Sequence, residues 1–239
     1  MRNWEMQGLL IVFEGVEGSG KTTQLQRSLH WLQDEGLSEC LGTFAQEISV
    51  VATREPGGTL LGLGLRKLLL GEGSRYENTT PTPIQDRAEL LLYAADRAQH
   101  VEEFLKPHLA SGMIILCDRY TDSTIAYQGY GRGLDLTLIQ QLNEIATGGL
   151  ESDLTLWLDV DASIGLKRAR QRGSADRIEQ ADFAFHQRVQ GGFQQLATSH
   201  PQRIVRIDGS KSEEEVHLTI QEILRQRLSQ WYSKLSCPL

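Results

Sequence analysis

The stretch GVEGSGKT at residues 15–22 comes one residue after the short apolar run LLIVF at residues 9–13. It satisfies the pattern G-x-x-x-x-G-K-[ST]. The apolar run has the length of a buried strand, and residues 21–32 carry leucines at helical spacing. A strand, a glycine-rich loop and a helix in this order form the structural context in which the pattern binds phosphate. The stretch therefore predicts a phosphate-binding P-loop; the alternative is a glycine-rich turn with an incidental lysine.

The residue types in this loop indicate a nucleoside triphosphate bound with a metal ion. Glycines let successive backbone N–H groups surround the β-phosphate, and the dipole of the following helix favours the same anion. Lys21 can reach the β and γ oxygens, and the Thr22 hydroxyl can ligate Mg²⁺. We expect ATP to contact Gly15, Val16, Glu17, Gly18, Ser19, Gly20, Lys21 and Thr22.

Apolar runs of strand length recur along the chain, with helix-like segments between them. Further runs lie at residues 48–52, 113–117, 154–158 and 204–207. Their continuous apolar character is typical of parallel strands that are covered by helices on both faces. Five alternations of strand and helix predict a doubly wound α/β fold. No linker divides the sequence, so we expect one domain over residues 1–239, with a helix at 212–231 on its outside.

Composition excludes several classes of partner. The formal net charge is -7, and no dense run of Lys or Arg is present, which argues against nucleic acid. The three cysteines, Cys40, Cys117 and Cys237, lack metal-site spacing and fit a reducing compartment. No apolar stretch approaches the roughly 18 residues that span a bilayer, and no signal pattern opens the chain. We expect a cytoplasmic protein that does not bind membranes.

A P-loop alone does not distinguish a kinase from a GTPase, a motor or a ligase. The guanine-binding NKxD and the switch motif DxxG are absent from the sequence. Arginines instead occur in separate places, at Arg54, Arg97, Arg119 and in the polar segment RARQRGSADRIE at residues 168–179. Because each of two anionic substrates needs its own cations, this distribution favours a kinase that acts on a second phosphorylated molecule.

Two longer motifs resemble the thymidylate kinase family, in its bacterial subgroup. LCDRYTDSTIAYQ at residues 116–128 is similar to the family signature over its full length, and TREPGGT at residues 53–59 is similar to a second hallmark. The order of motifs, from the P-loop to the arginine-rich lid at about 168–179, also matches. The resemblance covers essentially the whole chain. Residues 37–49 depart from it as a longer connection, and a few additional residues precede the first strand.

The resemblance implies a nucleoside monophosphate kinase fold with a five-stranded parallel sheet and a lid, usually in a homodimer. It implies transfer of the γ-phosphoryl group of ATP to dTMP, which gives dTDP. The acceptor phosphate has a second pKa near 6, so it is mostly an oxyanion at neutral pH and needs no general base. The protein has to align two anions and neutralise the charge on the transferring group.

By resemblance, the acceptor nucleotide has a defined set of contacts. Arg119 binds the acceptor phosphate, Arg97 hydrogen-bonds the thymine edge, and Tyr93 stacks on the ring or, as the alternative, packs in the core. Glu17 lies near the sugar 3′-hydroxyl, and Tyr127 forms a wall beneath the deoxyribose. The expected dTMP-binding residues are Glu17, Arg54, Tyr93, Arg97, Arg119, Tyr127 and Gln128.

The expected catalytic residues are Lys21, Asp118, Arg119 and Arg172. Asp118 organises Mg²⁺ together with Thr22 or orients Arg119; the alternative is an ion pair at a strand end. Because Gly18 and Ser19 occupy positions where some family members carry an arginine, the missing charge is expected from the lid. Arg168 and Arg172 are one helical turn apart, so Arg168 can lie over adenine while Arg172 enters the phosphate gap. A solvated basic helix end is the alternative for either arginine.

Two other functions fit the P-loop. One is a different deoxynucleoside monophosphate kinase, which base selectivity would separate. The other is an ATP-binding regulatory module that has no acceptor. A module of that kind needs no second anion site, so Arg97 and Arg119 are the residues that argue against it.

Overall fold

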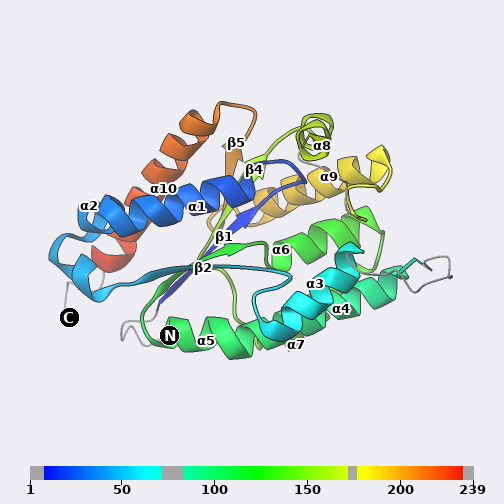
Figure 1. Cartoon of the computed structure of the whole chain (residues 1–239), viewed down its shortest axis with the longest axis horizontal. Helices are drawn as coiled ribbons and strands as arrows, with labels where there is room; N and C mark the ends of the chain where they lie inside the picture. The colour runs from blue at the N-terminus through cyan, green and yellow to red at the C-terminus, as the bar shows by residue number, and fades with distance from the viewer. Residues whose placement is uncertain (1–7, 72–82, 172–176, 234–239) are drawn as a thin grey trace.

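The structure is a computed structural model that describes residues 8–71, 83–171 and 177–233. Its centre is a five-stranded sheet in the order β2-β3-β1-β4-β5, and all four pairings are parallel (Figure 1). The prediction of a doubly wound α/β fold is confirmed. The strands are β1 (Leu9–Glu14), β2 (Val50–Arg54), β3 (Ile114–Asp118), β4 (Leu154–Asp159) and β5 (Ile204–Asp208).

The alternation of side chains along β1 explains why its sequence is apolar at consecutive positions. Leu9, Ile11 and Phe13 belong to one buried cluster, whereas Leu10 and Val12 belong to another on the opposite face. Successive side chains of a strand point to opposite faces, so a strand with helices on both sides buries both sets. Apolar burial on two faces is the main force that fixes this strand at the centre of the sheet.

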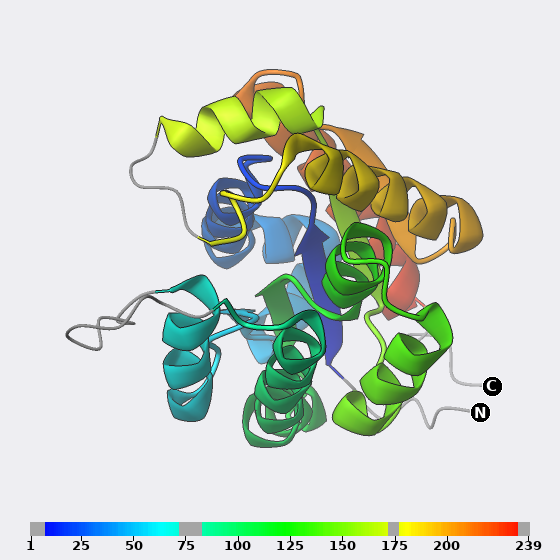
Figure 2. The same ribbon diagram turned by 90° about the vertical axis from the view of Figure 1, so that its right-hand side faces the viewer.

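One face of the sheet is covered by the helices at the two ends of the chain (Figures 1 and 2). The C-terminal helix, predicted at 212–231, forms at Glu213–Ser233 and buries Val216, Ile220 and Leu224. The connection at 37–49 is helical and packs on this helix through Leu37 and Leu41. Here lie α1 (Lys21–Trp31), η1 (Leu32–Gly36), α2 (Leu37–Leu41), η2 (Gly42–Glu47) and α10 (Glu213–Ser233).

The remaining helices lie on the other face of the sheet and along the edge at which the strands have their carboxyl ends. The apolar pattern at 88–105 belongs to a continuous helical run, in which η3 joins α4 to α5. Helices α3, α4 and α7 pack side by side (Figure 2). The elements are α3 (Leu60–Leu70), α4 (Asp86–His100), η3 (Val101–Leu105), α5 (Lys106–Ala110), α6 (Thr121–Thr124), η4 (Ile125–Gly131), α7 (Leu136–Thr147), α8 (Ala162–Arg170) and α9 (Phe183–Ser199).

The register of the sheet brings the sequence motifs to one edge. Asp118 at the end of β3 pairs with Phe13 of β1 on one side and with Arg54 of β2 on the other. The P-loop follows β1, TREPGGT begins with the last two residues of β2, and the DRY motif (residues 118–120) begins with the last residue of β3. In open parallel sheets ligands bind outside the carboxyl ends of the strands. Within the described residues, no helix is long and apolar enough to cross a membrane.

Candidate active site

The P-loop backbone takes a conformation that its glycines permit. Gly18 has φ 69°, and a Cβ atom there would lie 2.0 Å from the carbonyl oxygen of Gly165. Gly20 has φ 90° and precedes α1 without a side-chain cap. The backbone of Gly165 therefore leaves no room for a side chain at Gly18. At the start of α1, Gly20 has no side chain that could cap the first N–H groups of the helix. These groups are free to bind an anion at the helix N-terminus.

Lys21 is buried within the loop. Its Nζ donates hydrogen bonds of 2.9 Å to the carbonyl oxygens of both Gly15 and Val16. Burial, assisted by the positive charge of Arg119, lowers the pKa of Lys21 to about 8. A phosphate next to Nζ would add negative charge beside this ammonium group and favour its charged form.

Thr22 and Asp118 are in contact and line one cavity beside the P-loop. Thr22 Oγ1 donates a hydrogen bond of 2.6 Å to Asp118 Oδ2. Within the described residues, no group of three or more His, Cys, Asp or Glu side chains could hold a metal. Mg²⁺ that is bound together with a nucleotide takes one or two protein oxygens and otherwise uses phosphates and water. The hydroxyl and the carboxylate fit such an ion.

Arg119 lies at the junction between the P-loop and the acceptor side. It has φ 73°, which is a left-handed conformation that is uncommon for a residue with a side chain. Its guanidinium pairs with Glu17, donates to Ser123 Oγ at 3.1 Å and lies 4.8 Å from the centroid of the Tyr127 ring. In the described part of the chain Arg119 pairs with Glu17 and not with its neighbour Asp118. The alternative of an ion pair at the strand end does not describe this arginine.

Glu14 supports the turn that carries Arg119. Its carboxylate accepts from the backbone N–H groups of Tyr120 (2.9 Å) and Ser123 (3.0 Å) and from the Ser123 hydroxyl (2.6 Å). Burial raises the pKa of Glu14 to about 7, and the charge of Arg119 opposes that rise. No sequence pattern indicates this role, because Glu14 stands between an apolar run and the P-loop.

Two adjoining cavities lie at this edge. The phosphate cavity, of about 440 Å³, is bounded by the P-loop, Arg54, Asp118 and Ala169. The acceptor cavity is bounded by Tyr93, Arg97, Tyr127, Gln128 and Ile178. Four side chains line both cavities: Glu17, Glu55, Arg66 and Arg119.

The acceptor cavity combines aromatic walls with fixed polar groups. Tyr93 is partly exposed on it, which differs from full burial in the core. The Tyr127 hydroxyl donates to Glu17 Oε1 at 3.0 Å, and its ring packs edge-on against Phe185 and Phe193. Gln128 Nε2 donates to Glu89 Oε1 at 2.8 Å. The Tyr127 hydroxyl and the Gln128 amide nitrogen are thereby held in place by protein partners.

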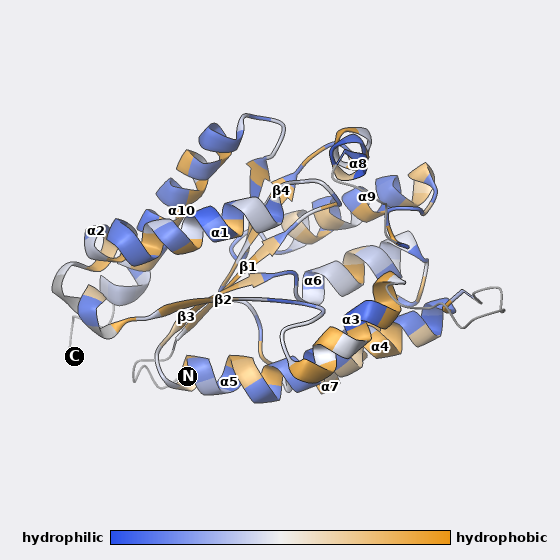
Figure 3. Ribbon diagram, in the orientation of Figure 1, coloured by the Kyte–Doolittle hydropathy of each residue, from blue (hydrophilic) through white to orange (hydrophobic). Residues whose placement is uncertain are grey.

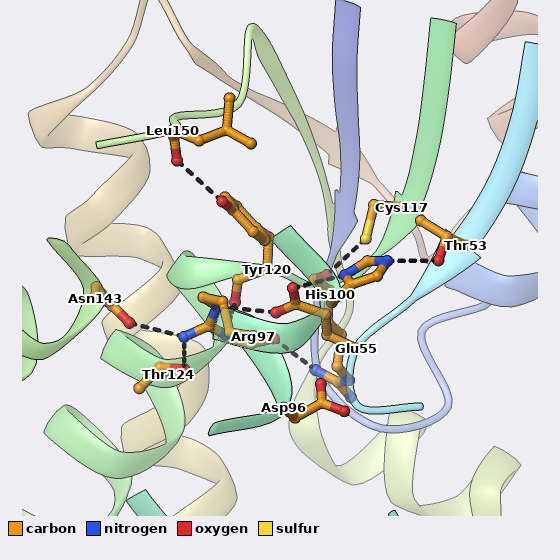
Figure 4. A network of polar contacts seen from close by, with 12 residues as sticks. Thr53, Glu55, Asp96, Arg97, His100, Cys117, Tyr120, Thr124, Asn143 and Leu150 are labelled. Carbon is orange, nitrogen blue, oxygen red and sulfur yellow. Dashed lines mark hydrogen bonds and ion pairs between the residues drawn. The ribbon is translucent and has the colours of Figure 1, made fainter. Parts of the chain in front are cut away.

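Arg97 lies at the base of the acceptor cavity and is 2% exposed. Its Nε donates to Glu55 Oε2 at 2.9 Å, and its Nη1 donates to Thr124 Oγ1 and Asn143 Oδ1 at 2.9 and 2.7 Å. Its Nη2 donates to the carbonyl oxygen of Tyr120 at 3.0 Å (Figure 4). A guanidinium has five N–H groups, and these bonds use one on Nε, two on Nη1 and one on Nη2. Among the residues that the structure describes, one N–H of Nη2 has no partner and remains for a ligand.

The predicted lid falls partly outside the described residues, and Arg172 lies in that part. Arg168 Nη1 donates to the carbonyl oxygen of Gly209 at 3.1 Å, which places it beside the segment after β5. Arg177 pairs with Glu89, and its Nε donates to the carbonyl oxygen of Leu69 at 2.9 Å. Arg177 is therefore directed to the acceptor side.

Sequence reasoning missed several lining residues. Glu55, Ser123 and Thr124 lie inside the quoted motifs, so the motifs themselves were a signal for them. Arg66 donates to the carbonyl oxygen of Pro56 at 3.0 Å and lines both cavities. It stands in the apolar helix α3, outside every motif, and only its position in space reveals it.

Comparison with known proteins gives one consistent family. The model of the family described as thymidylate kinase matches residues 13–220. The thymidylate kinase of Cyanothece sp. is 58% identical over 241 residues, which cover 97% of this chain and 99% of that protein. That of Nostoc punctiforme is 61% identical over 224 residues, covering 93% and 98%. The crystal structure of thymidylate kinase from Ehrlichia chaffeensis has a TM-score of 0.67 at 34% identity and covers 91% of this chain and 99% of that one.

Proposed function

The chain belongs to the thymidylate kinase family, and from this membership we propose a role for each side chain of the two cavities. The protein phosphorylates dTMP to dTDP and uses ATP as the phosphoryl donor. One observation carries the assignment of roles: Arg119 and Glu17 line both the phosphate cavity and the acceptor cavity. The phosphates of two bound substrates would therefore meet at these residues.

The phosphate cavity is the proposed donor site. The β- and γ-phosphates lie in the P-loop and against Lys21, whose Nζ exchanges its carbonyl partners for phosphate oxygens. Arg168, beside Gly209, covers the adenine. Arg172 supplies positive charge between the substrates. This arrangement stabilises the charge of the transferring group, which is the main contribution that a protein makes to phosphoryl transfer.

The acceptor cavity is the proposed dTMP site. Arg119 and Arg54 bind its phosphate, Tyr93 stacks on the base, and Tyr127 and Glu17 contact the sugar. Gln128 lies beside the base. The free N–H on Nη2 of Arg97 meets the O4 carbonyl of thymine. Because dTMP arrives as an oxyanion, these residues align it and no base removes a proton.

We also propose that the Thr22 hydroxyl and the Asp118 carboxylate would hold Mg²⁺, directly or through water, beside the donor phosphates. The 2.6 Å contact between these two side chains supports the proposal, since it brings the two oxygens together and both residues line the phosphate cavity. The ion would neutralise part of the triphosphate charge. The protein's own contribution is to hold the hydroxyl and the carboxylate in place.

A homodimer is the proposed assembly, and the cytosol the proposed location. Leucines at positions 60, 61, 63 and 68 of α3 are exposed, as are Leu91 of α4, the helix that packs against α3, and Ile145 of α7. Figure 3 shows the apolar colouring on α3 and α4. An exposed apolar face of this kind marks a protein interface. We propose that residues 1–239 form a single domain that contains both sites.

A coupled assay of ADP release tests the function. We expect release with dTMP, weaker release with dUMP, and little with dCMP or dGMP, because thymine presents a carbonyl to Arg97 and a methyl group to the apolar wall. Release at the same rate without any monophosphate would instead support the regulatory ATPase. Light scattering across a range of protein concentrations tests the dimer.

A further inference from the structure

We propose that His100 is a positioning residue for base selection: through Glu55 it fixes the guanidinium of Arg97 in the one orientation that accepts thymine. The inference rests on the proposed contact between Arg97 and the base. His100 itself lines neither cavity. Figure 4 shows the chain of contacts from Thr53 through His100 and Glu55 to Arg97.

Glu55 is the link between the two residues. It is 4% exposed, and each of its carboxylate oxygens has a different partner. Oε2 accepts from Arg97 Nε at 2.9 Å, and Oε1 contacts His100 Nδ1 at 2.9 Å. Its backbone N–H donates to the carbonyl oxygen of Asp118 at 2.9 Å. A carboxylate held at both oxygens cannot rotate without breaking a contact, so it transmits the position of His100 to Arg97.

His100 is fully buried, and its surroundings hold the ring in place. Its Nε2 contacts Thr53 Oγ1 at 2.7 Å, and the ring stacks on Phe104 with 5.6 Å between centroids. A Cβ atom on Gly58 would lie 2.5 Å from the ring, so the backbone of that loop presses on it. In the neutral imidazole, Nδ1 donates to the Glu55 carboxylate and Nε2 accepts from the Thr53 hydroxyl. Both nitrogens are then satisfied.

A fixed guanidinium selects a base more strongly than a mobile one. Arg97 offers a single remaining N–H to the ligand. Thymine presents an acceptor at O4, whereas cytosine presents the N4 amino donor at the same place. A donor facing a donor inside a buried site leaves both unpaired, and this mismatch is what rejects the wrong base. If Glu55 could swing, the Nε of Arg97 would lose its partner, the guanidinium would be held through Nη1 and Nη2 alone, and the rejection would weaken.

Two substitutions of similar polarity separate positioning from packing. In His100→Asn the amide nitrogen stands near the position of Nδ1 and keeps the donor to Glu55. In His100→Gln the amide reaches the position of Nε2 and keeps only the contact with Thr53. His108→Asn is the matched control. His108 also stacks on Phe104, with 4.1 Å between ring centroids, but its Nδ1 contacts the Phe104 carbonyl oxygen and not Glu55.

The measurement is the dissociation constant of dTMP and of dCMP by calorimetry, with the KM for ATP and the thermal midpoint of each variant. We expect His100→Gln to reduce the preference for dTMP over dCMP by about tenfold, which is the effect of one lost hydrogen bond to a charged group. We expect His100→Asn to keep most of the preference and His108→Asn to keep all of it. The KM for ATP should stay within about twofold of wild type in each, because neither substituted histidine lines the phosphate cavity.

Equal losses for both monophosphates in His100→Gln, or an equal preference in the Asn and Gln variants, would overturn the inference and leave His100 as a packing residue. Arg97→Gln separates this outcome from failure of the proposed base contact. If Arg97→Gln leaves the preference unchanged, Arg97 does not read the base and the proposed contact itself is wrong. If it abolishes the preference while His100→Gln does not change it, only the positioning role is wrong.

Discussion

Thr22 Oγ1 lies 2.6 Å from Asp118 Oδ2 and joins two motifs that are 96 positions apart in the chain. The contact connects the first turn of α1 to the end of β3, and both residues line the phosphate cavity. In the proposed assignment, this contact joins the loop that binds the donor to a strand end that carries both the carboxylate for the metal and the arginine for the acceptor.

Replacing Asp118 with Asn should raise the Mg²⁺ concentration that gives half-maximal rate by about tenfold, since a ligand or an outer-shell partner of the metal is lost. The measurement is the initial rate against free Mg²⁺ at saturating substrates. Asp135→Asn, at the exposed start of α7, is the control. An unchanged Mg²⁺ dependence together with a raised KM for dTMP would make Asp118 an orienting residue for Arg119.

Removal of the Lys21 side chain, in Lys21→Ala, should lower kcat by a factor of about 10² to 10³, as expected when one charge on the transferring group is lost. The fold should survive, because the bonds of Nζ are to loop carbonyls and not to the apolar core. Steady-state kinetics and a thermal midpoint measure the two effects. A kcat within about threefold of wild type would exclude Lys21 from the mechanism.

The lowered pKa of Lys21 predicts that kcat/KM for ATP falls at alkaline pH. Burial brings the pKa to about 8, so the free enzyme loses the ammonium charge above that pH. The value of kcat/KM for ATP reports the free enzyme and should therefore fall as pH rises through about 8. Arginine stays charged in this range, so the residual kcat/KM of Lys21→Arg should not fall as pH rises through about 8. A flat wild-type profile up to pH 9.5 would contradict the shift.

The sequence predicts the sheet well because the inner strands β1, β3 and β4 bury side chains on both faces. The second strand is shifted from its predicted position: the apolar run lies at 48–52, and the strand forms at Val50–Arg54. Ile48 is buried in the core without belonging to the strand, whereas the polar Thr53 and Arg54 belong to it. Apolar periodicity measures burial, and strand ends at a binding edge carry polar residues.

The polar contacts inside the site could not be predicted in the same way. His100 and Glu55 are 45 positions apart, and Glu14 and Ser123 are 109 apart. A histidine or glutamate within a helix or strand pattern is indistinguishable from a surface residue until the fold places it. The motifs located the cavities, and the three-dimensional arrangement supplied the buried groups that hold the motif residues.

Glu14 should make the folding stability depend on pH. Its folded pKa of about 7 exceeds the ordinary value of 4.5, and Arg119 and Asp122 are the charged groups that face it. Between these values the folded protein binds more protons than the unfolded chain. The stabilisation from this proton is present below pH 4.5 and is lost as pH rises through 7. Glu14→Gln resembles the protonated acid, so urea unfolding from pH 5 to 8 should show a smaller fall in the variant. Parallel curves would refute the assignment.

Arg172→Ala should lower kcat more than it raises the KM for dTMP, because a lid cation acts mainly when charge develops between the substrates. The experiment measures both parameters at saturating ATP. Arg177→Ala is the comparison, since Arg177 is engaged by Glu89 and the Leu69 carbonyl on the acceptor side. If Arg172→Ala changes only the KM for ATP, Arg172 is a ground-state ligand of the nucleotide and Arg170 becomes the candidate.

Choice of sugar is expected to depend on the ring of Tyr127, which forms the proposed wall beneath the deoxyribose. The ring is held edge-on by Phe185 and Phe193 and is 6% exposed, so it cannot move aside for a 2′-hydroxyl. That hydroxyl would lose its hydration and find no partner. Tyr127→Ala should therefore relax the preference for dTMP over its ribose analogue by about 1–3 kcal/mol.

Tyr127→Phe separates the wall from the hydroxyl. It keeps the ring and removes only the 3.0 Å bond to Glu17, so the sugar preference should stay near that of wild type. The quantity to compare is the ratio of kcat/KM for the two sugars in wild type and both variants. Alanine leaves a gap beside two phenylalanines and will lower stability, which a thermal midpoint records. A general loss of activity in Tyr127→Ala with an unchanged sugar ratio would mean that Tyr127 only packs against its aromatic neighbours.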